Sequence, residues 1–176
     1  RGTKQVDRSG IGLVLADPAT VRKELKSGMA LNFRFQIPPG TRDYVSRADF
    51  RFSQPSLLLS LMPHMHLRGK SMRFEAEYPD GRREVLLDVP RYEFDWQNLY
   101  ALAEPKPMPE GTILHTEAHF DNSDENPNNP DPKRAVTFGE QTWDEMHIGY
   151  LNFILADQDL TLGAPVSKKL ADGRYE

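Results

Sequence analysis

Short runs of alternating apolar and polar residues, separated by prolines and glycines, make up most of the chain. Runs of about four to eight residues bounded by turn residues are typical of β-strands. Two turn sequences, Pro79-Asp80-Gly81 and Pro109-Glu110-Gly111, stand before such runs. The pattern predicts strands at 11–16, 31–37, 44–52, 57–62, 72–78, 84–89, 112–120 and 146–155.

One segment, 19–26, is the single candidate for a short peripheral helix. Asp17-Pro18 suits its start and Ser27-Gly28 suits its end. Eight or nine strands without long helices between them predict an all-β fold, an antiparallel, jelly-roll-like β-sandwich. The length suits one domain over 1–176, and residues 164–176 are polar enough to fray.

Composition removes several classes of function. A net charge of −4 without a basic stripe argues against nucleic-acid binding. No window approaches the roughly 18 apolar residues of a transmembrane helix. There is no secretory leader and the first residue is Arg1, so we expect a chain that is processed or excised from a longer protein. Without cysteine there are no disulfides, thiolate metal sites or cysteine nucleophiles, and no hydrolase elbow or phosphate-binding loop is present.

The histidines occur in groups, and the first group is a His-x-His pair. Residues i and i+2 of a strand share a face about 6.6 Å apart, so His64 and His66 can reach one ion. His115 and His119 would lie about 13 Å apart, so at most one of them is a further ligand of a given centre. An ordinary surface pair, and hydrogen-bonded sheet histidines, are the alternative interpretations.

Met146 stands where the last predicted strand begins. A thioether is a soft ligand, and together with imidazole it favours copper, especially Cu(I). Packing in the core is the alternative role for this methionine. His147 would point to the opposite face of a regular strand.

Further segments accompany these residues. They are Pro63-His64-Met65-His66-Leu67-Arg68-Gly69-Lys70, Tyr78-Pro79-Asp80-Gly81, Phe94-Asp95-Trp96-Gln97, Ala118-His119-Phe120-Asp121-Asn122-Ser123, Asn129-Pro130-Asp131-Pro132 and Gly139-Glu140-Gln141-Thr142-Trp143-Asp144-Glu145-Met146. Together they resemble the C-terminal domain of the copper type II, ascorbate-dependent monooxygenases, the peptidylglycine α-hydroxylating and dopamine β-monooxygenase family, and in particular its bacterial members. The resemblance covers about residues 8 to 155.

This resemblance implies an antiparallel β-sandwich in which His64, His66 and Met146 bind the catalytic copper. That copper activates dioxygen to hydroxylate a C–H bond of an organic substrate, with ascorbate or another external electron donor. It further implies that Tyr150 contacts substrate and that the protein is exported, to the periplasm or outside a bacterial cell. The acidic pair Asp144-Glu145 is a candidate acceptor for the ring N–H groups of the histidines.

The chain also departs from the family. Family hydroxylases use a second copper, bound by three histidines of another domain, and no histidine precedes His64 here. We therefore expect a separate electron-supplying domain or redox protein. Met62 stands where peptide-binding members have a basic residue, so a peptide carboxylate is not the expected substrate.

Two alternatives remain: a non-catalytic copper or electron-transfer module of a larger redox assembly, and a metal-free structural or interaction sandwich that uses loop 122–132 or an open strand edge.

Overall fold

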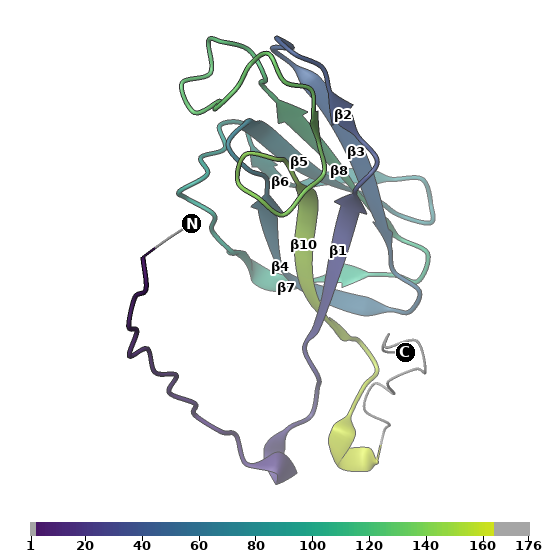
Figure 1. Ribbon diagram of the computed structural model, residues 1–176. Helices are drawn as coiled ribbons and strands as arrows, with labels where there is room; N and C mark the ends of the chain where they lie inside the picture. The colour runs from purple at the N-terminus through teal and green to yellow at the C-terminus, as the bar shows by residue number, and fades with distance from the viewer. Residues whose placement is uncertain (1–2, 164–176) are drawn as a thin grey trace.

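Two four-stranded antiparallel sheets pack face to face in the computed structural model, which describes residues 3–163 (Figure 1). The first, called here the β4 sheet, has the order β1-β10-β4-β7; the second, the β8 sheet, has the order β3-β8-β5-β6. A two-stranded ribbon, β2 with β9, lies beside them. The strands are β1 (Lys26–Asn32), β2 (Gln36–Ile37), β3 (Tyr44–Arg51), β4 (Ser56–His64), β5 (Gly69–Glu77), β6 (Arg83–Val89), β7 (Tyr100–Met108), β8 (Ile113–Phe120), β9 (Val136–Thr137) and β10 (His147–Leu155).

The prediction of an all-β antiparallel sandwich is confirmed, whereas three predictions near the N-terminus are wrong. The predicted strand 31–37 is divided between the end of β1 and the short β2, and residues 33–35 between them belong to no strand. Segment 11–16 is not a strand, and its apolar side chains are exposed. The predicted helix 19–26 is reduced to one 3₁₀ turn, η1 (Pro18–Thr20), and β1 begins at Lys26. A helix of eight residues is too short to be stable without packing. Instead, the Lys23 ammonium group donates to three backbone carbonyls at and after the end of β10, those of Leu155, Ala156 and Gln158.

Strand β7 is absent from the predicted set, and it contains two prolines, Pro105 and Pro107. It forms at an edge of the β4 sheet, where a missing N–H can face away from the neighbouring strand. A second 3₁₀ turn, η2 (Leu160–Leu162), follows β10. The prediction that 164–176 fray lies outside the described residues. Within 3–163, no helix has the length and apolar character needed to cross a bilayer.

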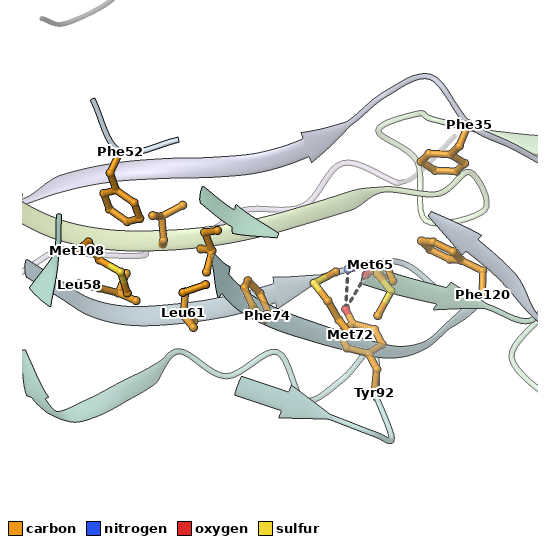
Figure 2. Packing of buried hydrophobic residues seen from close by; sticks show 14 of the residues in the cluster. Phe35, Phe52, Leu58, Leu61, Met65, Met72, Phe74, Tyr92, Met108 and Phe120 are labelled. Carbon is orange, nitrogen blue, oxygen red and sulfur yellow. Dashed lines mark hydrogen bonds between the residues drawn. The ribbon is translucent and has the colours of Figure 1, made fainter. Parts of the chain in front are cut away.

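The core lies between the two sheets. It includes three fully buried phenylalanines, Phe52, Phe74 and Phe120 (Figure 2). Met65 also belongs to it, and the Tyr92 hydroxyl fixes the backbone there by donating to the Met65 carbonyl at 2.6 Å and accepting from the Met65 N–H at 3.1 Å. The backbone next to the histidine pair is therefore anchored in the core.

A bulge in β4 decides which side chains face the core. The β10–β4 ladder pairs Asn152 with Ser60 and Phe153 with Leu58, so Leu59 has no partner. An extra residue of this kind inverts the alternation of faces along a strand. Leu58 and Leu61 consequently both point into the core, and Met62 and His64 point outward; His66, two residues beyond the end of β4, is buried at 5% exposure.

The close approach of the sheets depends on Gly149 in β10. A Cβ at this position would lie 2.6 Å from Thr116 Cγ2 and 2.8 Å from Phe74 Cε1, inside van der Waals contact. We expect Gly149→Ala to lower the free energy of unfolding by about 1–3 kcal/mol, the usual cost of overpacking. Gly12→Ala is the matched control, because nothing lies within 4 Å of a Cβ there. Equal denaturation midpoints for the two variants would contradict this account.

Candidate metal centre

His64 and His66 stand together on the outer face at the end of β4. Their ring centroids are 5.3 Å apart and the rings are nearly perpendicular, at 86°. Pro63 lies between Met62 and His64 where β4 still pairs with β10, and the last residue of β4 in the β7 ladder is Leu61. The missing N–H of Pro63 therefore costs no ladder hydrogen bond on the β7 side. The predicted pairing of the two imidazoles on one face agrees with the structure.

Hydrogen bonds orient both rings. Nδ1 of His64 lies 2.6 Å from Oε1 of Gln97, and the amide of Gln97 is itself held because its nitrogen donates to the Phe94 carbonyl. Nδ1 of His66 lies 3.3 Å from the Asp144 carbonyl oxygen. Both partners are acceptors, so each neutral ring donates through Nδ1 and carries its lone pair on Nε2. This is the state in which imidazole binds a metal, with the other nitrogen fixed by an outer partner.

The environment of His66 favours the neutral ring over the charged one. Burial lowers the pKa of His66 below the ordinary value; the Asp144 carbonyl opposes this shift, and the adjacent His64 reinforces it. A neutral ring can bind a cation without first losing a proton.

Glu145 joins the segments that carry His66 and Met146. Its carboxyl group is fully buried, and Oε2 accepts from the His66 N–H at 2.8 Å and from the Met146 N–H at 3.1 Å. Oε1 accepts from the Arg68 N–H at 2.6 Å. Burial raises the pKa of Glu145 to about 7, although the three N–H groups oppose the shift. One side chain thus fixes the distance between two backbone segments that are 79 residues apart.

Met146 follows directly, on the same outer face as the histidines. His147 points inward, and Ile148 pairs with His64 in the β10–β4 ladder, so residues 146, 148 and 150 face outward with His64. Tyr150 lies beside the pair, with its ring centroid 6.0 Å from that of His64. The structure therefore brings the rings of His64, His66 and Tyr150 together, and the alternation of β10 continues this outward side to Met146, the residue before the strand.

His115 and His119 lie elsewhere. Both face outward from the β8 sheet, on the opposite side of the sandwich, where Nδ1 of His115 meets Asp49 at 2.6 Å and Nδ1 of His119 meets Asp43 at 2.9 Å. The strands of the β8 sheet separate them from His64, so we remove both from the set of further ligands. They are hydrogen-bonded sheet residues.

His147 is buried between the sheets in a chain of hydrogen bonds. Thr116 Oγ1 donates to the Ala48 carbonyl, so it accepts from Nε2–H of His147 at 3.0 Å. Nδ1 of His147 then accepts from the Ser46 hydroxyl at 2.8 Å, and Ser46 in turn accepts from Asn32. Burial lowers the pKa of His147 to about 4, which keeps the ring neutral. As its position in the strand predicts, its side chain points to the face opposite that of His64.

Gln97, Phe94 and Arg68 were not among the predicted site residues. The Phe94 ring meets the His66 ring edge to face, at 6.1 Å between centroids. The Arg68 guanidinium is fully buried; it donates from Nε to Asn122 and from Nη1 to the Trp143 carbonyl. Gln97 and Phe94 both belong to the motif Phe94-Asp95-Trp96-Gln97, so the sequence contains a signal for these two residues. No sequence spacing, however, shows that the Arg68 side chain points away from the histidines. Of the predicted acceptors, Asp144 acts through its backbone carbonyl and Glu145 binds backbone N–H groups.

No three His, Cys, Asp or Glu side chains gather as a metal site within residues 3–163. The candidate centre has two such residues and a thioether, and its two oriented imidazoles fit a soft cation such as Cu(I).

Comparisons with known proteins leave the family of this chain open. No protein family model and no curated protein matches the sequence. Similar solved structures include the infectious bursal disease virus Gt strain (15% identity, 82% of this chain, 38% of that chain, TM-score 0.32) and the VP2 subviral particle of infectious bursal disease virus (14%, 82%, 37%, 0.33). The chain spans less than two fifths of these proteins, and at such TM-scores the likeness supports no argument about its function.

Proposed function

We propose that the outer face of the β4 sheet binds one copper ion through His64, His66 and Met146. The observation that carries the proposal is the pair of adjacent imidazoles whose Nδ1 atoms both face acceptors, which leaves both Nε2 lone pairs available to a ligand. The position of Met146 supports it, because Glu145 binds the backbone of Met146 and of His66 through one oxygen.

The activity we propose is that of the dioxygen-activating half of a copper monooxygenase. Bound copper would supply the one-electron and dioxygen chemistry for hydroxylation of a C–H bond. The overall reaction consumes R–H, O₂, two electrons and two protons and gives R–OH and water, with the electrons from ascorbate or another external reductant. In this scheme Gln97 and the Asp144 carbonyl hold the ligand tautomers, and Tyr150 contacts the substrate. An exported setting, periplasmic or extracellular, belongs to the same proposal.

An electron-transfer or copper-binding module is the second candidate. The chain has five histidines, and the three outside the pair are held by Asp49, by Asp43 and by the Ser46–Thr116 chain. A second copper would thus have to come from a partner domain or redox protein. Formation of R–OH from an added R–H, coupled to ascorbate-dependent oxygen consumption by the copper-loaded chain, separates the two candidates, because a copper module can oxidise ascorbate with dioxygen but does not hydroxylate a C–H bond.

An anaerobic Cu(I) titration against a competing chelator tests the site. We expect one ion per chain, with affinity reduced by at least about 100-fold in His64→Ala and in His66→Ala, since even outer partners of ligands cost about 10–100-fold. Met146→Ala should weaken Cu(I) more than Cu(II), because the lost ligand is soft.

His115→Ala and His119→Ala are matched controls on the other sheet and should bind copper like the wild type. Affinity that is indifferent to His64, His66 and Met146 would overturn the proposed site and leave the structural sandwich as the leading interpretation.

A further inference from the structure

The outer face of the β4 sheet carries ordered rows of side chains beside the candidate metal centre. Ladder pairing places Leu31, Ile148 and His64 in one row, and Met29, Tyr150 and Met62 in the next. The row after that is polar, because Ser27, Asn152 and Ser60 hydrogen-bond to one another. An apolar surface two rows deep therefore lies between the histidines and a polar border.

This surface carries no acidic or basic side chain other than His64, and it is partly exposed: Met29 is exposed, Leu31, Met62, His64 and Tyr150 are half-buried, and Ile148 is buried. None of the outward positions in the three rows carries a charged side chain, and Met29 is 49% exposed. Leu99, two residues from the Gln97 that binds His64, is 54% exposed. Arg68, the cation closest to the pair in sequence, is fully buried and points to Asn122 and Trp143. Apart from His64, which the proposed function makes a copper ligand, no side chain in these rows can form an ion pair with a carboxylate or an ammonium group of a ligand.

The outer face of the β8 sheet, by contrast, carries many charged side chains. There Arg47 pairs with Glu117, and Arg83 pairs with Glu75 and Glu77. Solvent-facing sheets of this kind are ordinarily polar. The apolar rows of the β4 sheet therefore differ from what solvent exposure alone favours, and they adjoin the candidate metal centre.

We propose that the substrate is an uncharged, largely apolar organic molecule that lies on Met29, Met62 and Tyr150. This inference rests on the proposed function, and it names the substrate class of the same site. The Tyr150 ring and the thioethers of Met29 and Met62 bind the hydrocarbon part of this molecule. The C–H bond to be oxidised lies toward His64 and His66. The Tyr150 hydroxyl makes no hydrogen bond within residues 3–163, so it is available to one polar, neutral group of the ligand.

The six methionines make the test specific. Three face outward, at Met29, Met62 and Met146; the others, Met65, Met72 and Met108, are at most 1% exposed in the core. Methyl-¹³C-methionine NMR spectra of the Cu(I)-loaded chain, recorded without oxygen, report on both groups at once. The probes are matched in shape: neutral 3-phenylpropionamide, anionic 3-phenylpropionate and cationic 3-phenylpropylamine.

We expect the neutral amide to shift the Met29 and Met62 methyl signals, to leave the core signals in place, and to bind about tenfold more tightly than either ion, since an unpaired charge is costly to desolvate. Met62→Arg should reverse the preference in favour of the anion, whereas Val45→Arg, the same change on the outer face of the β8 sheet, should leave it unchanged.

Copper content, measured on each sample before the probe is added, separates the two possible failures. A chain that takes up no copper overturns the proposed function. A copper-loaded chain that binds an ion as tightly as the amide, or whose outward methionines do not respond to the amide, overturns the inference about the substrate.

Discussion

Glu145→Gln should lower the free energy of unfolding by about 3 kcal/mol and weaken copper binding by about tenfold. The carboxylate accepts three backbone N–H groups, from His66, Arg68 and Met146. Glutamine keeps the volume but replaces one acceptor oxygen by an NH₂ group, so at least one buried N–H then faces a donor. If the amide oxygen stays at the position shared by His66 and Met146, the Arg68 N–H between the ligands loses its acceptor; if it takes the other position, His66 and Met146 are loosened together.

Urea denaturation and the Cu(I) titration on the same preparation check this prediction. Glu140→Gln is the matched control, since it makes the same change at an exposed position of the same loop. If Glu145→Gln bound copper as the wild type does while losing stability, Glu145 would support the fold without positioning the ligands.

Replacement of His147 should change how stability depends on pH. The ring bridges Ser46 and Thr116 in the neutral state, and its pKa is lowered to about 4 in the folded chain from an ordinary 6.5. As the pH falls, the unfolded chain takes up the proton first, so the contribution of His147 is complete above pH 6.5 and is lost toward pH 4. The shift corresponds to roughly 3 kcal/mol.

His147→Leu removes this titration together with two hydrogen bonds. We expect the variant to be less stable than the wild type by about 2 kcal/mol at pH 7, and the difference to shrink or reverse at pH 4. The difference between the two proteins is the quantity to measure, because Glu145, whose raised pKa acts in the opposite sense, is common to both. Parallel unfolding curves over this pH range would contradict the buried neutral ring.

The period-two pattern predicted most of the sandwich, because its strands have one buried and one solvent-facing side. It missed β7, whose prolines are tolerated only through its place at a sheet edge, which a local pattern does not contain. It also predicted a strand at 11–16, where the residues have strand character but form no ladder among the described residues. Strand propensity requires a pairing partner, and pairing is a property of the whole fold.

For the candidate site as well, the local sequence pattern predicted some features, whereas others depend on the whole fold. The spacing of His64 and His66 placed them on one face, but the approach of Met146 depends on the β10–β4 ladder, which joins segments far apart in the chain. The roles of Asp144 and Glu145 could not be assigned from sequence, since adjacent acidic residues differ here in whether the backbone or the side chain takes part. Arg68, two residues after His66, is directed by Asn122 and Trp143, which no local spacing relates to it.

The unpaired Leu59 also affects how the site can vary in evolution. Substitutions along β4 leave the direction of each side chain intact, but the loss of one residue between Leu58 and His64 would turn the His-x-His pair inward, against Phe74 and the rest of the core. A homologue could thus keep the His-x-His sequence unchanged and still lack the proposed copper site on the outer face of the β4 sheet. In this fold, insertions and deletions upstream of the motif are more informative about metal binding than the identity of the residues between them.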